Sequence, residues 1–453
     1  MHLHVLGICG TFMAGLAHLA RELGHTVSGS DLNVYPPMSD FLAATEIEVR
    51  LGWDLSHLTP RPDLVIIGNA LSRGNPLIEE ILDQRIPYTS GPAWLAEHVL
   101  RGRHVLAVAG THGKTTTTSL LAWILEVCGR APGFLLGGIP ENFAQPARLG
   151  GGRYFVIEAD EYDTAFFDKR SKFIHYGPAT VILNNLEFDH ADIFKDLAAI
   201  QTQFQHLIRT VPRRGVVVWN RDDHALEATL AQGLWSRQVT FGEAAEADWK
   251  LTRSATEVLP RYTVTTPDSA AIPLQSPLPG RHNALNVLAA LAAAAQLGIP
   301  IADSLEAVKT FKNVKRRLQI LGAVDGVTVY DDFAHHPTAI AATVSALREQ
   351  VGAAQIVAVL ESRSNTMRMG VHQHAIAPAL AAADVALLYA PPNLGWDVSV
   401  ATAALGSRAT AHATLEDLLL ATRRAATPGS HVLVMSNGDF GGFQRRLLAE
   451  LAA

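Results

Sequence analysis

Cysteine is almost missing from this chain, since only Cys9 and Cys128 occur among its 453 residues. Two thiols cannot supply a disulfide framework or a zinc cluster, so a reducing compartment, the cytoplasm, is expected. An excess of basic charge is missing as well, because the formal net charge is −6. A general nucleic-acid binder needs a basic face, and we therefore expect no nucleic-acid partner.

Long apolar runs are also lacking. The alanine-rich stretch at residues 288–297 is too short to span a bilayer and predicts a packed helix. The first residues carry no basic segment and enter a strand-like run directly, so neither a signal peptide nor a membrane partner is expected. A chain of this length with 48% apolar residues is too large for one core and predicts two to four domains.

The loop AGTHGKTTT at residues 109–117 carries the strongest chemical pattern. An apolar strand-like run precedes it and an apolar helical stretch follows it. This arrangement turns backbone N–H groups and a helix N-terminus toward one point, where a polyphosphate binds. Lys114 is expected to reach the β- and γ-phosphates, and the Thr115 hydroxyl to hold Mg²⁺. A full P-loop has a glycine where Val108 stands, so the loop is a shortened variant, and a chance Gly-Lys-Thr is the alternative.

The first hundred residues predict a smaller α/β unit. A glycine-containing turn at residues 7–13 follows the first strand, and Asp31 follows the second. A glycine turn with an acidic residue about 20 positions later is typical of dinucleotide-binding folds. Cys9 stands where the second glycine of that pattern belongs, which argues against ordinary NAD binding. A nicotinamide-dependent oxidoreductase nevertheless stays an alternative.

Polar residues follow the buried strands of the middle region. Glu158 ends one strand and begins the acidic cluster 158–163, and His190 follows the next strand. Because the carboxyl ends of parallel strands share one edge of a sheet, we expect these residues near Lys114. Carboxylate and hydroxyl oxygens suit Mg²⁺, which makes this edge a candidate metal site. A solvated acidic turn and a structural histidine are the alternatives.

Alternation of apolar and polar residues at 247–273 predicts an antiparallel edge of this domain.

The last region alternates strands and helices again, which predicts another open α/β sheet. Polar strand ends occur at residues 331–337, 361–368 and 436–440, where a doubly wound fold binds ligands. Arg363 and Arg368 suit a substrate that carries carboxylates.

Several motifs, taken in chain order, resemble those of the Mur ligases. They are AGTHGKTT (109–116), EADE (158–161), NNLEFDH (184–190), GRHNALN (280–286) and Arg316-Arg317. The resemblance covers essentially the whole chain. Mur ligases form amide bonds in peptidoglycan synthesis and recycling, and they use ATP to activate a carboxylate.

The resemblance implies three α/β domains. They are a Rossmann-like UDP-sugar-binding domain (1–102), a central P-loop ATPase-type domain with a mainly parallel sheet (103–315) and a Rossmann-like peptide-binding domain (316–453). An arrangement of three domains around one ATP implies that the domains close on each other when substrates bind.

The motif DDFAHHPT (331–338) resembles the branch of the family that adds to UDP-N-acetylmuramate itself. One member of that branch adds L-alanine, and another adds the tripeptide L-Ala-γ-D-Glu-meso-diaminopimelate during recycling. The segments 7–13, 138–143, 158–169, 362–367 and 436–443 resemble the tripeptide ligase. We therefore expect that activity, with the L-alanine ligase as the alternative. Residues 198–206 contain no lysine, so the carbamylated lysine of other Mur ligases is expected to be absent.

The resemblance also implies the site residues. Catalysis falls to Lys114, Glu158 and His190, and metal binding to Thr115, Glu158 and His190, with Mg²⁺ expected and Mn²⁺ able to replace it. The expected ATP ligands are Gly110, Thr111, His112, Gly113, Lys114, Thr115, Thr116, His282, Asn283, Arg317 and Asp332. The expected UDP-muramate ligands are Gly7, Cys9, Gly10, Thr11, Asp31, Ser72 and Asn142. The expected peptide ligands are His335, His336, Arg363, Ser364, Asn365 and Asn437.

A non-catalytic, nucleotide-regulated binding module is a further alternative. It predicts ATP binding without turnover that depends on the other substrates. A monomer or a weak dimer is expected.

Overall fold

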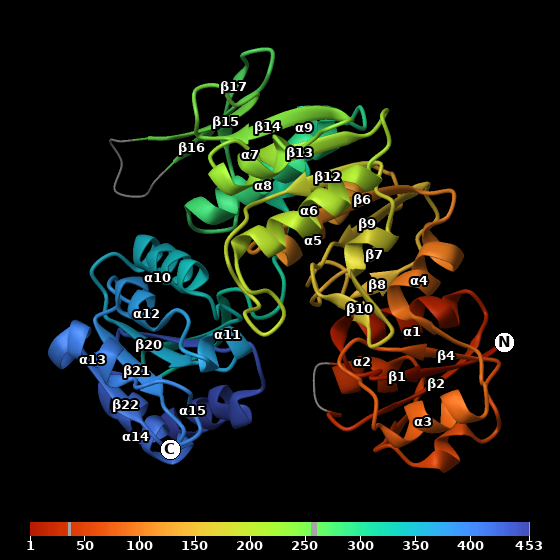
Figure 1. Cartoon of the computed structure of the whole chain (residues 1–453). Coiled ribbons are helices and arrows are strands. Elements are labelled where there is room, and N and C mark those ends of the chain that lie inside the picture. Colours follow the sequence, from red (N-terminus) through yellow and green to blue (C-terminus); the bar gives the residue numbers. More distant parts are fainter. Residues whose placement is uncertain (35–37, 255–260, 453) are drawn as a thin grey trace.

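The computed structural model describes residues 1–34, 38–254 and 261–452, and these fold around three main β-sheets (Figure 1). The N-terminal sheet has five parallel strands in the order β3-β2-β1-β4-β5. Its strands are β1 (His2–Leu6), β2 (Thr26–Asp31), β3 (Glu48–Leu51), β4 (Leu64–Ile67) and β5 (Tyr88–Ser90), with helices α1 (Thr11–Glu22), α2 (Met38–Ala44), α3 (Pro76–Asp83) and α4 (Gly91–Leu95). This strand order is that of a Rossmann sheet without its sixth strand, which confirms the Rossmann-like expectation.

The central sheet has ten strands in the order β17-β16-β15-β14-β13-β12-β6-β9-β7-β8. They are β6 (His104–Ala109), β7 (Gly133–Leu135), β8 (Ala147–Arg148), β9 (Tyr154–Glu158), β12 (Thr180–Leu183), β13 (Val216–Asn220), β14 (Arg237–Gly242), β15 (Trp249–Arg253), β16 (Tyr262–Thr265) and β17 (Ala271–Leu274). β9, β6 and β12 are parallel neighbours, so their carboxyl ends meet at one edge. β15 to β17 form the antiparallel edge that alternation predicted; residues 255–260 of that stretch lie outside the described residues.

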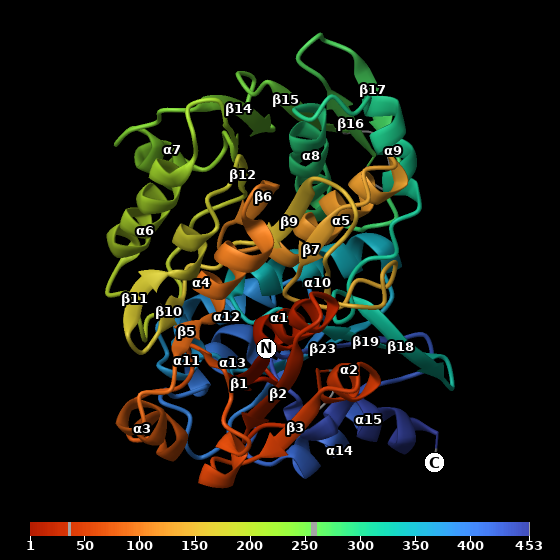
Figure 2. The ribbon, with the colours of Figure 1, turned by 90° about the vertical axis from the view of Figure 1, so that its right-hand side faces the viewer.

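Helices cover both faces of the central sheet, as Figure 2 shows. They are α5 (Lys114–Val127), α6 (Leu197–Thr210), α7 (His224–Leu230), α8 (Arg281–Ala295) and α9 (Ile301–Lys309). The alanine-rich run lies in α8, which packs against α5 and is buried over most of its length. Small side chains allow this close packing between the helices. Within the described ranges, no helix is both long and apolar enough to cross a membrane.

The C-terminal sheet has six strands in the order β18-β19-β23-β20-β21-β22, all parallel except β18. Its strands are β18 (Gln319–Val324), β19 (Val327–Asp332), β20 (Ile356–Glu361), β21 (Val385–Tyr389), β22 (Ala409–His412) and β23 (His431–Met435). Its helices are α10 (Pro337–Val351), α11 (Asn365–Arg368), α12 (Gln373–Ala379), α13 (Ser399–Leu405), α14 (Leu415–Ala425) and α15 (Phe443–Leu451). The expected second open α/β sheet is confirmed.

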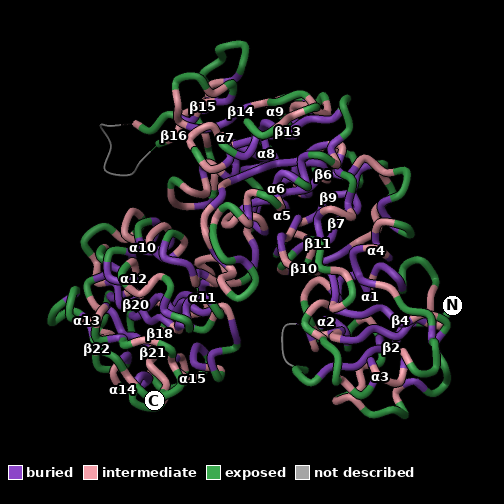
Figure 3. Tube along the Cα trace, viewed as in Figure 1, coloured by how far each residue is buried: buried purple, intermediate pink, exposed green. Residues whose placement is uncertain are grey.

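The N-terminal and central parts share one hydrophobic core, whereas the C-terminal part has its own (Figure 3). Gly15 of α1 lies so close to the central sheet that a Cβ there would stand 2.4 Å from Leu135 Cδ1. The C-terminal part instead follows a connection at which Arg316 and Leu318 both have positive φ, 63° and 49°. The N-terminal part is therefore packed directly onto the central part, whereas the C-terminal part is joined to it through this connection.

Candidate active site

The loop before α5 approaches its neighbours too closely for any residue but glycine. Gly113 has a φ of 77°, and a Cβ at this position would stand 2.3 Å from Asn286 Oδ1 of α8. Its place immediately before α5 leaves the first N–H groups of that helix free for an anion. The Lys114 Nζ atom folds back over the loop and donates to the Gly110 carbonyl at 2.7 Å. The loop thus has the geometry expected of a phosphate-binding loop.

Glu161 connects two residues that the sequence placed at this edge. One of its carboxylate oxygens lies 3.2 Å from Lys114 Nζ, and the other lies 3.1 Å from His190 Nε2. Burial opposes the charge of this carboxyl, yet Lys114 and His190 hold its pKa down to about 2. Burial likewise opposes the charges of Lys114 and His190, but the carboxylates raise both pKa values above their ordinary values. The Glu161 carboxylate therefore favours the protonated forms of both Lys114 and His190.

Glu158 and Thr115 meet as the metal hypothesis requires. The Thr115 hydroxyl donates to Glu158 Oε1 at 3.1 Å, and the Gly137 N–H donates to Glu158 Oε2 at 2.8 Å. Burial raises the pKa of Glu158, although Lys114 and Thr115 act against this rise. A buried carboxylate whose pKa is raised by burial gains most from a cation beside it. The Arg317 Nη2 atom reaches the same hydroxyl at 3.4 Å.

A cavity of about 240 Å³ lies beside the loop, between the central and C-terminal parts. Among the predicted ATP ligands, it is lined by His112, Gly113, Thr116, His282, Asn283, Arg317 and Asp332. Gly110, Thr111, Lys114 and Thr115 lie outside this lining, in the phosphate-binding loop. Both oxygens of Asp332 already accept backbone N–H groups, from Leu318 at 2.6 Å and from Ala334 at 2.7 Å. Asp332 therefore also braces the connection to the C-terminal part.

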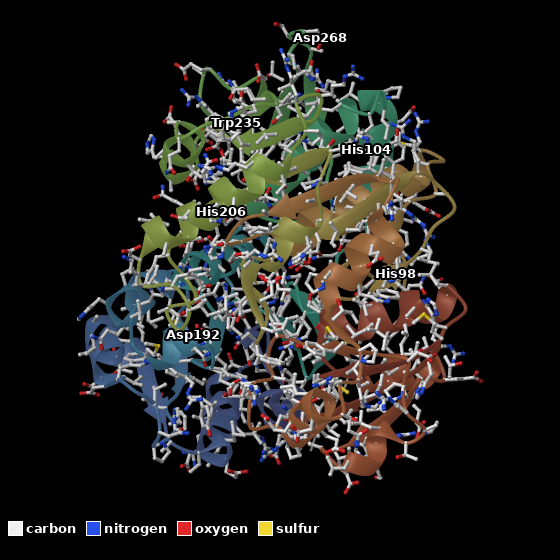
Figure 4. All side chains as sticks on the ribbon, turned by 45° about the vertical axis from the view of Figure 1, so that its right-hand side comes forward. His98, His104, Asp192, His206, Trp235 and Asp268 are labelled. Carbon is white, nitrogen blue, oxygen red and sulfur yellow. The ribbon has the colours of Figure 1, made fainter. Side chains whose placement is uncertain are left out.

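Residues of the C-terminal part form hydrogen bonds with the loop that follows β12 of the central sheet. The Asn365 amide donates to Asp192 Oδ2 at 2.7 Å, and the Thr338 hydroxyl donates to Glu187 Oε2 at 2.6 Å. Figure 4 labels Asp192 where the central part approaches the C-terminal part. His336, which caps α10, lies 3.6 Å from the same Glu187 oxygen. Two of the predicted peptide ligands, Asn365 and His336, thus lie at the central edge.

The other predicted peptide ligands follow the ends of β19, β20 and β23. Arg363 is exposed, and its guanidinium packs directly against Gly438. Asn437 Oδ1 is buried and has no hydrogen-bond partner among the described residues. Ser364 caps α11 through its hydroxyl. His335 is bonded through Nδ1 to the Phe333 carbonyl, and burial lowers its pKa to about 4.

The predicted UDP-muramate ligands are only partly brought together. Asp31 braces the 7–11 turn, because one of its oxygens accepts the Cys9 N–H group at 2.9 Å. Its other oxygen accepts the N–H group of Asn33, just after β2, at 3.0 Å. Gly7, Gly10 and Thr11 belong to this turn and to the start of α1, and Ser72 is exposed on the loop after β4. The Asn142 amide instead binds the backbone of Thr310 and Lys312. Both of its polar groups are therefore engaged near the connection to the C-terminal part.

Sequence reasoning left several cavity residues out of the site. They are Asn184, Asn185, Glu187, Asn220, Phe241, Arg281, Asn286 and Thr338. Asn184 and Asn220 end neighbouring strands, so the same rule that selected Glu158 could have selected them. Phe241 lies within β14, where a buried aromatic residue carries no sign of a ligand.

Three family profiles match this chain in consecutive stretches. Residues 2–103 match the "Mur ligase family, catalytic domain", residues 108–294 match the "Mur ligase middle domain" and residues 316–438 match the "Mur ligase, glutamate ligase domain".

Full-length relatives extend this similarity. An Escherichia coli (strain K12) protein named UDP-N-acetylmuramate–L-alanyl-γ-D-glutamyl-meso-2,6-diaminoheptandioate ligase is 54% identical and is aligned over 100% of this chain and 98% of its own length. The Haemophilus influenzae protein of the same name is 50% identical, with 99% of each chain covered. A UDP-N-acetylmuramate–L-alanine ligase from Nitrobacter hamburgensis is 36% identical over 80% of this chain and 77% of its own length.

A solved structure agrees with these relatives. The crystal structure of a murein peptide ligase from Psychrobacter arcticus superimposes with a TM-score of 0.79 at 43% identity, covering 100% of this chain and 99% of the other.

Proposed function

This chain belongs to the Mur ligase family, and from that premise we propose that it joins L-Ala-γ-D-Glu-meso-diaminopimelate to UDP-N-acetylmuramate at the expense of ATP. The observation that carries the proposal is the buried Lys114–Glu161–His190 chain beside the phosphate-binding loop. A cation, a carboxylate and a histidine in this order suit the binding of phosphate and metal beside a reacting carboxylate.

The similarity distinguishes the tripeptide from L-alanine as the second substrate. Relatives named for the tripeptide are 54% and 50% identical over essentially the whole chain, whereas the L-alanine ligase is 36% identical over 80% of it. The enzyme therefore acts in peptidoglycan recycling, in which a released tripeptide is attached to the nucleotide sugar again.

A carboxylate does not condense with an amine in water unless it is activated. In our account, a lactyl carboxylate oxygen of UDP-N-acetylmuramate attacks the γ-phosphorus of ATP, and ADP leaves. The neutral tripeptide amine then attacks the acyl phosphate. The resulting tetrahedral intermediate loses a proton from nitrogen to solvent, releases phosphate and retains the new C–N bond. Lys114 and the loop N–H groups hold the phosphates, and positioning supplies most of the rate.

The donor set fits a hard divalent cation. Thr115 Oγ1 and Glu158 Oε1 lie 3.1 Å apart, and we propose that they hold one Mg²⁺. His190, which Glu161 orients, would complete a second position that also accepts Mn²⁺. A bound cation would neutralise charge on the transferring phosphoryl group.

We propose that ATP lies in the cavity beside the loop. His112, Gly113, Thr116, His282, Asn283 and Arg317 line it. We assign the ribose to Asp332, which also lines the cavity and accepts the Leu318 N–H group. The nucleotide sugar is assigned to the 7–11 turn, Asp31 and Ser72. The peptide is assigned to the ends of β19, β20 and β23, with His335, His336, Arg363, Ser364, Asn365 and Asn437.

The domain limits at residues 102/103 and 315/316 are part of this proposal. A cytoplasmic location fits an enzyme that consumes ATP, and a monomer or weak dimer is proposed.

Phosphate release tests the proposal directly. With ATP, Mg²⁺ and UDP-N-acetylmuramate present, we expect release on addition of the tripeptide and little on addition of L-alanine. Efficient release with L-alanine would overturn the choice of peptide substrate. ATP binding without substrate-dependent release would support the binding-module alternative instead.

A further inference from the structure

Lys172 is a buried lysine at the boundary between the N-terminal and central parts. It begins the short helix η3 (Lys172–His175), and it is only 8% exposed. Helix α4 of the N-terminal part packs against η3. A hairpin of β10 (Asp163–Ala165) and β11 (Asp168–Ser171) leads into η3. It also contacts the N-terminal part, because the ring centres of Phe167 and Tyr88 of β5 lie 5.1 Å apart. Figures 1 and 2 both show this hairpin beside the N-terminal elements.

The Lys172 Nζ atom stands between the two substrate regions proposed above. It lies 5.7 Å from the ring centre of Phe12, in the first turn of α1, and 5.5 Å from that of Tyr162. The Tyr162 ring in turn lies 4.2 Å from the His190 ring. The ammonium group is therefore placed between the glycine-containing turn and the Lys114–Glu161–His190 chain.

This ammonium has more donors than partners. Asp160 Oδ2, at 3.3 Å, is the one hydrogen-bond acceptor that the described residues offer it. An ammonium has three N–H donors, and burial of a charge with unsatisfied donors is costly. The two aromatic rings favour a cation at this position but accept no conventional hydrogen bond. Two donors therefore remain for an anionic oxygen that enters between the two parts.

We infer that Lys172 binds an anionic group of the nucleotide-sugar substrate and so aligns that substrate with the catalytic centre. This inference rests on the proposed function. Two groups of UDP-N-acetylmuramate have the required chemistry, the lactyl carboxylate and the diphosphate. Lys172 acts as a positioning residue in either case, and its role is separate from those of Lys114 and the metal ligands.

Calorimetric binding of three ligands to Lys172→Met tests the inference, because methionine keeps the length of the side chain and removes its charge. UDP-N-acetylmuramate is compared with UDP-N-acetylglucosamine, which lacks the lactyl carboxylate, and with UDP. Loss of one charged hydrogen bond should weaken binding about 10- to 100-fold. A loss confined to UDP-N-acetylmuramate assigns Lys172 to the carboxylate, and an equal loss for all three assigns it to the diphosphate. Unchanged binding of all three overturns the inference.

Matched variants separate binding from folding. Lys169→Met removes an exposed lysine of the same hairpin, which pairs with Asp163, and should bind every ligand as the unmodified enzyme does. Lys172→Arg keeps the cation and should restore binding to within a few-fold; if it binds as poorly as Lys172→Met, the inference fails. In turnover, the KM for UDP-N-acetylmuramate should rise while the KM for ATP stays constant. If the unmodified enzyme bound none of the three UDP ligands, the proposed function itself would fail.

Discussion

At the scale of single residues, Glu161 is the group on which the candidate site depends most. Its side chain is 3% exposed and contacts Lys114 with one oxygen and His190 with the other. Removing one partner of a buried charged pair leaves the other charge uncompensated. Since Glu161 contacts both Lys114, the proposed phosphate ligand, and His190, the proposed metal ligand, one substitution should disturb both proposed functions.

Glu161→Gln should lower kcat for phosphate release by about 10- to 100-fold, the usual effect of losing a partner that orients a metal ligand. Glutamine keeps the shape of the side chain but lacks the charge that both neighbours require. Asp163→Asn is the control, because Asp163 pairs with the exposed Lys169 on the neighbouring hairpin. A Glu161→Gln enzyme that turned over at the control's rate would contradict the assigned role.

His4 should make stability depend on pH, because it is fully buried in β1 between the hydroxyls of Ser28 and Ser30. Burial, followed by Arg50, lowers its pKa from 6.5 to about 3. Between pH 6.5 and pH 3, His4 is protonated in the unfolded chain but stays neutral in the folded protein. The free energy of unfolding therefore falls as the pH falls toward 3. At pH 5 the loss from this group is about 2 kcal/mol.

Thermal melting of His4→Gln between pH 7 and pH 5 measures this contribution. Glutamine retains hydrogen-bonding groups but does not titrate, so its melting temperature should fall less over this range than that of the unmodified protein. Parallel melting curves for the two proteins would refute the assignment.

At the scale of elements, the junction of β6, the loop and α5 is the place where we propose that phosphate binds. Gly113→Ala would strain a left-handed backbone and push a Cβ against Asn286. We expect ATP affinity to fall at least 10-fold, since the loop must shift to relieve the overlap. Gly129→Ala is the matched control, because Gly129 also has a positive φ, 68°, but no atom within 4 Å. Equal ATP affinities of the two variants, measured by calorimetry, would show that the close approach is unimportant.

Elements with a strong local pattern were predictable. The buried strands with polar ends placed Thr115, Glu158 and His190 at one edge of one sheet, and the structure brings all three there. The β10–β11 hairpin was not predictable, because its short strands carry no apolar alternation. Nor could the sequence select Glu161 from its acidic cluster, since the choice depends on which carboxylate the chain turns inward. Both features depend on tertiary structure, which the spacing of residues in the sequence does not predict.

At the scale of the whole molecule, the three parts differ in how firmly they are joined. The N-terminal and central parts share a continuous core. The C-terminal part instead meets the central part through polar contacts such as Asn365 with Asp192 and Thr338 with Glu187. Inter-domain contacts of this polar kind allow relative motion, so movement should belong to the C-terminal part.

Small-angle scattering should therefore record a smaller radius of gyration when ATP and UDP-N-acetylmuramate are both bound. Ligands that contact two domains favour the closed state by their greater affinity for it. Asn365→Ala, which removes one contact across the boundary, should reduce the compaction. Identical scattering with and without both ligands would exclude domain closure.

The central claim is that ATP activates the lactyl carboxylate by forming an acyl phosphate. Turnover of UDP-N-acetylmuramate labelled with ¹⁸O at both oxygens of that carboxylate tests it most directly, with the tripeptide as acceptor and mass spectrometry of the released phosphate. Because the attacking oxygen leaves with phosphorus, each phosphate should carry one ¹⁸O atom from the substrate. Release of phosphate without the label would contradict the account.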